Sequence, residues 1–320
     1  MKIKILVLGY SRIFQKRVLP ALKKVRMVDS ISVASLSKKI VKNDLITQVY
    51  NSYEEALKKF DGTFVYVSLS NNLHDEFVLK SLEKGFNVIV DKPAIIKQST
   101  MDKVEDIVSK SGLGIYESSV YSFHPVFNFL KKLIKKYEIE KIISIFRIPI
   151  IHKNDFRFQN LVGSGAEFDM SVYSLGFYNE LFEEDINDLN ILDVRKMKNI
   201  VKSFDIQLKT KDKTDFYGFY GFDSEYEHSA FFVGKGIKFE IKRIFSNPAD
   251  TKLILKKTVN NKTSFTEFDE VDSFFNFFEY VFQKKDRNEK TSLQKLKNNF
   301  NNLKLLKSKI SNYEKLNAKN

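Results

Sequence analysis

Lys92, Asp169 and Tyr173 are the side chains whose types and spacing could together move a proton. Lys92 directly follows the apolar run 87–91, and open α/β sheets bind ligands at the carboxyl ends of their strands. Asp169 and Tyr173 stand at positions i and i+4, so on a helix they share one face. A phenol titrates near ~10 in water, and a neighbouring ammonium favours its phenolate. The pattern predicts Tyr173 as proton donor or acceptor beside the charge of Lys92. Taken singly, Lys92 is more typical of a turn, and Asp169 and Tyr173 are more typical of a cap and of core filler; the ordered set favours the chemical role.

The turn after the first apolar run, 2–8, has features of a dinucleotide-binding turn. Such turns read G-x-G-x-x-G between a strand and a helix, and here those positions hold Gly9, Ser11 and Phe14. Ser11 is small enough to let the backbone approach a pyrophosphate, which a helix N-terminus can hold. Phe14 must change how the helix packs on the strand. The turn predicts dinucleotide binding, with a plain strand–turn–helix as the alternative.

The end of the second strand indicates which dinucleotide is preferred. NAD sites carry an acid there for the ribose 2′-hydroxyl, but the run 33–39 contains none, and Asp29 lies before the strand. Ser35, Ser37 and Lys38 could instead receive a 2′-phosphate. We expect NADP, with NAD still possible, and a polar turn with ordinary surface lysines is the alternative.

Strands and helices alternate over the first part of the chain. Apolar, β-rich runs occur at 2–8, 31–35, 64–68, 87–91 and 113–117, with helical patterns between them. Mostly apolar strands that alternate with helices predict a parallel sheet covered on both faces. We expect a doubly wound Rossmann domain over residues 1–120.

The pattern changes after Glu117. Short alternating stretches between about 191 and 270 predict an open, mainly antiparallel sheet with helices on one face. An apolar stripe over 292–316 predicts a long final helix, which could pack back on the first domain. The expected architecture is therefore α/β followed by α+β, with a substrate-binding and oligomerisation domain over 121–320.

Composition restricts the remaining classes. The 320 residues include no Cys, which excludes disulfides and thiolate metal sites, and the His residues lack metal-ligand spacing. The net charge of +13 suits anionic ligands such as a nucleotide-linked sugar, or reflects a Lys-rich surface habit. No module that reads nucleic acid, membrane span or signal peptide is recognisable. We expect a cytoplasmic protein without a metal, a membrane or a nucleic-acid partner.

Four ordered segments resemble the glucose–fructose oxidoreductase/inositol dehydrogenase (Gfo/Idh/MocA) family. They are the Gly9 turn, SLSNNLH at 68–74, DKP at 91–93 and GSGAEFDMSVY at 163–173. The corresponding family patterns are G-x-G-x-x-G, S-T-P-N-x-x-H, E-K-P and G-G-G-A-x-x-D-x-G-x-H/Y. Departures are Asp91 for Glu, serine or phenylalanine for glycines, and Tyr173 where many members have His. Some active members also have Tyr there.

The resemblance implies hydride exchange between a nicotinamide and a hydroxyl or carbonyl carbon of a sugar, with Lys92 and Tyr173 in proton transfer. Asp169 would hold a substrate hydroxyl or Lys92. We also expect a homo-oligomer, either a dimer or a tetramer. The family tends to form oligomers, and the second sheet is large and rich in aromatic residues. A non-catalytic member that senses a dinucleotide or sugar and binds a protein is the alternative.

The resemblance and the turn chemistry together give two lists of expected ligand contacts. The cofactor would meet Gly9, Ser11, Arg12, Ile13, Ser35, Ser37, Lys38, Ser68, Leu69, Asn71, His74, Asp91, Lys92 and Glu117. The sugar-like substrate would meet Lys92, Tyr121, His124, Arg157, Asp169 and Tyr173. His74 could shape the nicotinamide pocket or cap the helix that follows it.

Overall fold

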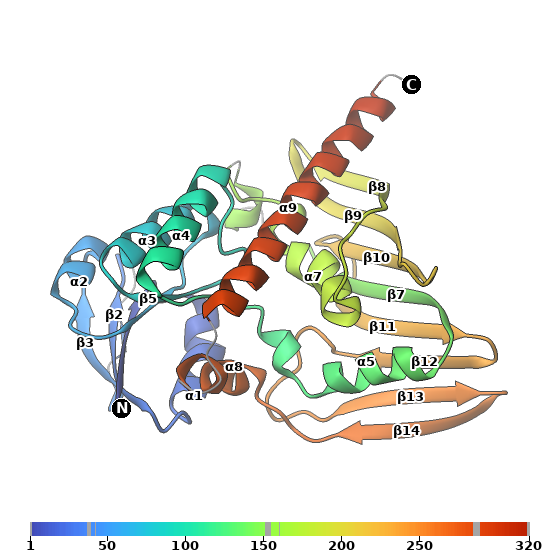
Figure 1. Ribbon diagram of the computed structural model, residues 1–320, viewed down its shortest axis with the longest axis horizontal. Coiled ribbons are helices and arrows are strands. Elements are labelled where there is room, and N and C mark those ends of the chain that lie inside the picture. The colour runs from blue at the N-terminus through green and yellow to red at the C-terminus, as the bar shows by residue number, and fades with distance from the viewer. Residues whose placement is uncertain are drawn as a thin grey trace. The chain divides into compact units, whose positions relative to one another are not determined.

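The chain divides into two units that are not contiguous in sequence. The computed structural model describes residues 2–36, 40–41, 43–150, 155–159, 161–283 and 289–318. The first unit contains Met1–Val120 and Phe274–Phe300, and the second contains Tyr121–Ser273 and Asn301–Asn320 (Figure 1). The segment Phe274–Phe300 belongs to the first unit, and it includes the start of the final helix, which the sequence allowed to pack back on the first domain.

The first unit is built on a parallel sheet of six strands in the order β3-β2-β1-β4-β5-β6. The strands are β1 (Ile3–Leu8), β2 (Val28–Ala34), β3 (Ile46–Tyr50), β4 (Phe64–Val67), β5 (Asn87–Val90) and β6 (Ile115–Glu117). Strand order reverses beside β1, which creates the switch point where open α/β sheets bind ligands. The predicted doubly wound fold is confirmed, although β3 was not recognised in the sequence.

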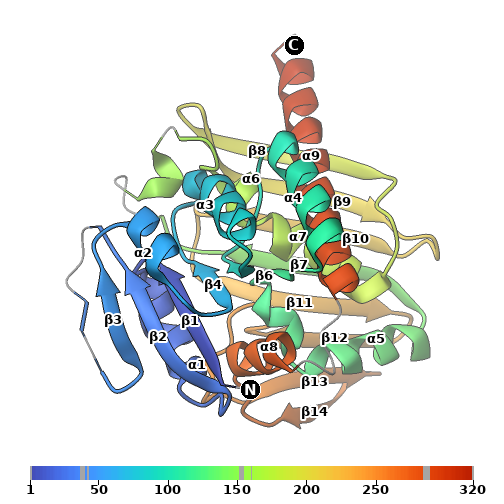
Figure 2. The same cartoon turned by 60° about the vertical axis from the view of Figure 1, so that its left-hand side comes forward.

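Helices cover both faces of this sheet (Figure 2). The contacts of alternate residues of β4 agree with this arrangement. Val65 and Val67 join one core with α3 (Asn71–Glu83) and α4 (Gln98–Ser111). On the other face, the ring of Tyr66 meets Phe278 of α8 (Ser273–Phe282) with 6.2 Å between centroids. The unit also contains η1 (Phe14–Val18), α1 (Leu19–Leu22) and α2 (Tyr53–Lys59). The sequence reading missed α2 and α8.

The second unit is built on a sheet of eight strands in the order β14-β13-β12-β11-β7-β10-β9-β8. The strands are β7 (Ile139–Arg147), β8 (Leu189–Met197), β9 (Ile200–Lys209), β10 (Asp215–Gly221), β11 (Glu227–Gly234), β12 (Ile237–Lys242), β13 (Leu253–Val259) and β14 (Lys262–Phe268). Within the described ranges, β7 and β10 form the one parallel pair. The predicted mainly antiparallel sheet is confirmed.

Helices lie on one face of this second sheet, as expected (Figure 1). They are η2 (Val120–Phe123), α5 (Val126–Lys136), η3 (Phe156–Phe158), α6 (Ala166–Asp169), α7 (Ser171–Phe182) and the later part of α9 (Glu289–Asn317). On β11, Ala230 and Phe232 are buried on the helix side, whereas Phe231 and Val233 on the opposite side are half-buried. Among the described residues, the opposite face of this sheet carries no helix.

The helix α9 contributes apolar residues to both cores. Leu296 and Phe300 belong to the first core, and Leu306 and Ile310 belong to the second. None of the helices in the described ranges combines the length and the apolar character needed to cross a membrane.

Candidate functional site

The turn after β1 requires glycine at position 9. Gly9 has φ +99°, and a Cβ there would lie 2.3 Å from the carbonyl oxygen of Ser68. A side chain would therefore clash with the backbone of the neighbouring strand end as well as adopting a rare conformation. This one glycine of the dinucleotide pattern remains because the chain after β1 passes directly against the end of β4.

Ser11 takes the place of the second glycine and caps the helical run that begins at residue 12. Its Oγ accepts a hydrogen bond from the backbone N–H of Phe14 at 3.0 Å and lies 2.7 Å from Ser68 Oγ. Arg12 and Ile13 are exposed at the start of this run, and its first turn carries no acid. A helix N-terminus whose first residues are exposed, next to a close backbone turn, fits a dinucleotide phosphate.

A hydrogen-bond network connects this turn to the residue before Lys92. Ser68 Oγ donates to Asp91 Oδ2 at 2.8 Å, and the fully buried Tyr66 hydroxyl donates to Asp91 Oδ1. Burial raises the pKa of Asp91, while these two donors stabilise its charged form and oppose the rise. Asp91 is thus fixed by two hydroxyls at the end of the adjacent strand β4, rather than free to contact a ligand with both oxygens.

The Lys92–Pro93–Ala94 segment is held from both sides. Glu117 Oε1 accepts a hydrogen bond from the Ala94 N–H at 2.8 Å. The ring of His74 lies with Nδ1 2.8 Å from the Pro93 oxygen and Nε2 3.0 Å from the Leu69 oxygen. Lys92 itself is half-buried. His74 therefore joins the loops that follow β4 and β5, and neither ring nitrogen caps α3.

Apart from the residues of the Gly9 turn, the expected residues of the first unit fall into three groups in the structure. The end of β4, β5 and β6 gathers Ser68, Leu69, His74, Asp91, Lys92 and Glu117. Ser35 and Asn71 are buried, and the N–H of Ser35 donates to the Tyr50 oxygen at 3.1 Å. Ser37 and Lys38, which were expected at the 2′-phosphate, lie outside the described residues.

In the second unit, Tyr173 sits on α7 among aromatic rings. Its ring centroid lies 4.8 Å from Phe146, 5.4 Å from Tyr121 and 5.6 Å from Phe245. Tyr121 is itself fixed, because its hydroxyl donates to the Val172 oxygen at 2.6 Å. Tyr173 remains half-buried, so packing sets the direction of its ring without covering it completely.

Asp169 forms an ion pair with Arg157 in the same unit. The carboxylate Oδ2 of Asp169 lies 3.3 Å from Arg157 Nε, and Asp155 lies 3.4 Å from Arg157 Nη1. Burial disfavours the charge of Arg157, but Asp169, Asp155 and Tyr173 outweigh it and raise the pKa of Arg157. Arg157 is thus a cation within the electrostatic reach of Tyr173, a pairing that the sequence spacing did not reveal.

His124 is buried, and its backbone N–H donates to the Tyr121 oxygen at 3.2 Å. Its Nδ1 accepts a hydrogen bond from the Val126 N–H at 3.2 Å, and burial lowers the pKa of His124 to about 4. It is therefore neutral near pH 7, and its Nε2 has no partner within the described residues. Across those residues, no group of three or more acidic or histidine side chains is arranged to hold a metal ion.

The combination of a parallel sheet, a glycine turn after β1 and an open second sheet defines a nucleotide-binding protein of the dehydrogenase type. Residues 3–116 match the model of one family, Gfo/Idh/MocA, described as an oxidoreductase family with an NAD-binding Rossmann fold. The predicted resemblance to the Gfo/Idh/MocA family is thus confirmed over this segment.

Two named relatives share distant sequence similarity with this chain. The dTDP-3,4-didehydro-2,6-dideoxy-alpha-D-glucose 3-reductase of Actinomadura kijaniata is 24% identical over 256 residues, which cover 77% of this chain and 76% of that protein. The D-xylose 1-dehydrogenase (NADP(+)) 2 of Haloferax volcanii is 26% identical over 178 residues, 53% of this chain and 54% of that protein.

Solved structures share the fold over nearly the whole chain. KijD10, a 3-ketoreductase from Actinomadura kijaniata in complex with NADP and TDP-benzene, superposes with a TM-score of 0.82 at 21% identity, over 93% of this chain and 95% of that one. Aldose-aldose oxidoreductase from Caulobacter crescentus gives 0.80 at 13% identity, over 97% of both chains. At these sequence identities, the superpositions show a shared fold.

Proposed function

We propose that this protein is an NADP-dependent oxidoreductase that transfers hydride between the nicotinamide and a hydroxyl or carbonyl carbon of a sugar or nucleotide-linked sugar. The observation that carries the proposal is the anchored segment after β5. Lys92 follows an Asp held by two hydroxyls, and the next peptide groups are held by Glu117 and His74. Such anchoring presents an ammonium at the ligand-binding edge of a parallel sheet.

Proton transfer is assigned to the side chains of the chain itself. The bound NADP supplies or accepts the hydride, and the oxygen on the reacting carbon then gains or loses a proton. Tyr173 is the proposed proton donor or acceptor, because its ring is fixed by aromatic packing and its hydroxyl lies within the field of Arg157. Lys92 supplies positive charge to the developing alkoxide. Asp169 orients Arg157 or a substrate hydroxyl.

The preference for NADP rests on the missing acid after β2. The run Ser35–Lys39 offers hydroxyls and lysines where an NAD site has a carboxylate. We expect calorimetric titration to give tighter binding of NADPH than of NADH. A clear preference for NADH would refute the assignment of Ser37 and Lys38 to a 2′-phosphate.

The substrate class is proposed from the family and from the names of the relatives. Mixing the protein with NADPH should change the nicotinamide fluorescence, and a panel of keto-sugars, inositols and nucleotide-linked sugars should contain at least one that is turned over. Cofactor binding without turnover across the whole panel would instead support the non-catalytic, ligand-sensing alternative.

The uncovered face of the second sheet is the proposed contact between copies of the chain, as expected from the sequence. Half-buried apolar residues lie side by side on it, among them Ile143, Tyr217 and Phe231 on three adjacent strands. Light scattering at micromolar concentration should report a dimer or tetramer, and a monomer would contradict this assignment. The lack of Cys suits a reducing compartment, so we place the activity in the cytoplasm.

A further inference from the structure

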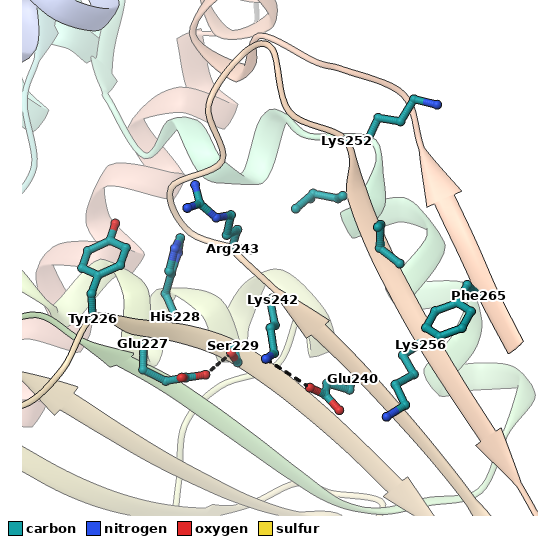
Figure 3. A pocket seen from close by; sticks show the side chains of 12 residues that line it. Tyr226, Glu227, His228, Ser229, Glu240, Lys242, Arg243, Lys252, Lys256 and Phe265 are labelled. Atoms are coloured by element: carbon teal, nitrogen blue, oxygen red, sulfur yellow. Dashed lines mark hydrogen bonds and ion pairs between the residues drawn. The ribbon is translucent and has the colours of Figure 1, made fainter. Parts of the chain in front are cut away.

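His228 lies on the helix-covered face of the second sheet. It pairs across the strands with Phe146 of β7, which in turn pairs with the fully buried Tyr220 of β10. Because successive side chains of a strand alternate between faces, Glu227 and Ser229 lie on the opposite, open face, which is proposed above for the contact between copies of the chain. Figure 3 shows the ring of His228 on the other side of β11 from these two side chains. His228 therefore does not belong to that contact surface.

The ring of His228 is a buried polar group whose hydrogen bonds are not made. Only 4% of the residue is exposed, and neither Nδ1 nor Nε2 has a hydrogen-bond partner within the described residues. Burial, together with the charge of Arg243, lowers the pKa of His228 to about 4, so the ring is neutral near pH 7. A neutral imidazole offers one N–H donor and one acceptor nitrogen. Leaving both unsatisfied in the interior costs stability, and a ligand hydroxyl, which both donates and accepts, can satisfy either nitrogen.

Contacts that do not involve the ring nitrogens set the position of His228. Its backbone oxygen accepts a hydrogen bond from the Arg243 N–H at 2.7 Å. Its ring stacks on Phe146, with 5.5 Å between centroids and 28° between planes, and meets the edge of Tyr226 at 4.9 Å. A phenylalanine could make every one of these contacts. Packing therefore does not explain why an imidazole, with a donor and an acceptor, stands at this position.

Phe146 connects His228 with the proposed proton donor of the reaction. The ring of Phe146 lies 4.8 Å from that of Tyr173 and also stacks at 5.3 Å on Phe245, itself 5.6 Å from Tyr173. His228 and Tyr173 are thus separated by a single ring that contacts both. His228 also lines, together with Tyr226, a hollow of about 600 Å³ at the start of β11. The imidazole therefore lies near both the proposed proton donor and open space.

We propose that His228 is a substrate-binding residue, whose ring forms a hydrogen bond with a hydroxyl of the sugar at a carbon other than the one that exchanges hydride. Tyr173 serves the oxygen on the reacting carbon. The assignment of the ligand as substrate rests on the proposed function, whereas the unsatisfied imidazole does not. His228 then determines specificity, because a site built to hydrogen-bond a hydroxyl discriminates against an analogue that lacks it.

Two variants in the same cross-strand row compare an unpaired with a paired polar group. His228→Phe keeps an aromatic ring of similar size and removes both nitrogens. Tyr220→Phe is the matched control, because it removes a buried hydroxyl that donates to Ser144 Oγ at 2.8 Å. In the protein without ligand, the midpoint of urea unfolding should be unchanged or higher for His228→Phe and lower for Tyr220→Phe. A gain in stability together with a loss of binding marks a residue kept for its ligand rather than for the fold.

Binding is measured by calorimetric titration of the keto forms of sugars and inositols into the full-length protein saturated with NADP⁺, so that they bind without being reduced. The compound that binds the wild type most tightly should bind His228→Phe about 3- to 10-fold more weakly, and Tyr220→Phe equally well. Its deoxy analogues identify the hydroxyl. The analogue that lacks it should bind the wild type and His228→Phe with equal affinity, since neither complex then contains the hydrogen bond.

Three results would overturn the proposal. They are a loss of stability in His228→Phe like that of Tyr220→Phe, equal binding of every compound to the wild type and His228→Phe, and no binding of any compound to the wild type. The two claims fail separately. Turnover that is unchanged in His228→Phe removes only the role of His228, and binding that depends on His228 without any turnover removes only the proposed reaction.

Discussion

The two units position their proposed functional residues in different ways. In the first, the residues belong to loops at the ends of adjacent parallel strands, and backbone or short polar contacts hold them. Ser68, Asp91 and Glu117 lie at the ends of β4, β5 and β6 in succession. In the second, Tyr173 is fixed by rings from η2, β7 and the loop after β12, and Asp169 by an arginine from η3.

This difference shows that strand topology positions the residues of the first unit, whereas side-chain packing positions those of the second. A parallel sheet brings the carboxyl ends of its strands to one edge whatever their exact sequence, so the first set tolerates replacement of two glycines and of the family glutamate. The second set has no such scaffold, and the direction of Tyr173 depends on which side chains surround it.

The largest effect on turnover is expected for Lys92 of the first set and Tyr173 of the second, which are proposed to act in the same proton transfer. Lys92→Met and Tyr173→Phe should each reduce turnover by ~10²–10⁴-fold, the usual contribution of a general acid or base, with nearly unchanged binding of NADPH. The double variant should lose far less than the product of the two factors, because groups that act as a unit are not additive. Steady-state oxidation of NADPH measures the losses, and nicotinamide fluorescence measures binding.

Lys97→Met, an exposed lysine in the same loop, is the control for Lys92→Met and should leave turnover intact. Full activity of Lys92→Met on the true substrate would remove the catalytic assignment. Tyr173→His should keep part of the activity, and its pH profile should move toward the titration range of imidazole.

The next prediction tests whether the first unit requires a glycine in the closely packed turn at position 9. Gly9→Ala must accommodate a Cβ 2.3 Å from the Ser68 oxygen, whereas Gly112→Ala, which also has a positive φ, of 69°, meets nothing within 4 Å. Both pay the cost of the left-handed conformation, about 1 kcal/mol or more, but only Gly9→Ala must also shift a strand end. We expect its melting temperature and its NADPH affinity to fall well beyond those of Gly112→Ala. Equal effects would mean that the turn is not tightly packed.

A pH-dependent effect is expected in the second unit at Glu167 of α6. Burial raises the pKa of Glu167 to about 7, and its Oε2 has no hydrogen bond within the described residues. Between pH 4.5 and 7, Glu167 is protonated in the folded protein and ionised in the unfolded chain. Its contribution to the free energy of unfolding therefore falls as the pH rises through that window. Glu167→Gln cannot ionise and should therefore be more stable than the wild type at pH 8, by about 1–3 kcal/mol, and closer to it at pH 5.

Urea unfolding at the two pH values measures this difference. The exposed Glu225→Gln serves as the control, and its stability should follow that of the wild type at both. Parallel pH profiles for Glu167→Gln and the wild type would show that the carboxyl group is solvated in solution.

The smallest effect concerns the network below Lys92. Tyr66→Phe removes one of the two hydroxyls that donate to Asp91, which should cost about 1–3 kcal/mol of stability, since the acceptor is a buried carboxyl group. Turnover should fall by a few fold through poorer placement of Lys92. Tyr50→Phe, at another buried tyrosine of the first unit, is the control. Unchanged turnover in Tyr66→Phe would show that Asp91 does not position Lys92.

The sequence predicted the first unit better than the second for a physical reason. The alternation of strands and helices and the order of motifs located Gly9, Ser68, Asp91 and Lys92, because parallel topology determines which loops meet. It did not reveal Tyr66 as the partner of Asp91, since Tyr66 reads as an ordinary apolar strand residue.

In the second unit, the alternation of apolar and polar residues indicated the antiparallel strands. It did not indicate which residues near the ends of those strands contact one another. Arg157 was expected near a substrate, yet its pairing with Asp169 depends on how the loop before α6 returns to the sheet. The helices α2 and α8 were missed because each is short. The strand β3 was missed because its exposed positions carry polar residues.

Transfer of deuterium from NADPH labelled at C4 tests the central claim most directly. The protein is incubated with the labelled cofactor and a panel of keto-sugars that includes nucleotide-linked ones, and products are analysed by mass spectrometry. The account predicts one deuterium on the reduced carbon of at least one sugar with the wild type, and a transfer rate about 10²–10⁴-fold lower with Lys92→Met. Tight binding of NADPH without deuterium in any product would contradict it.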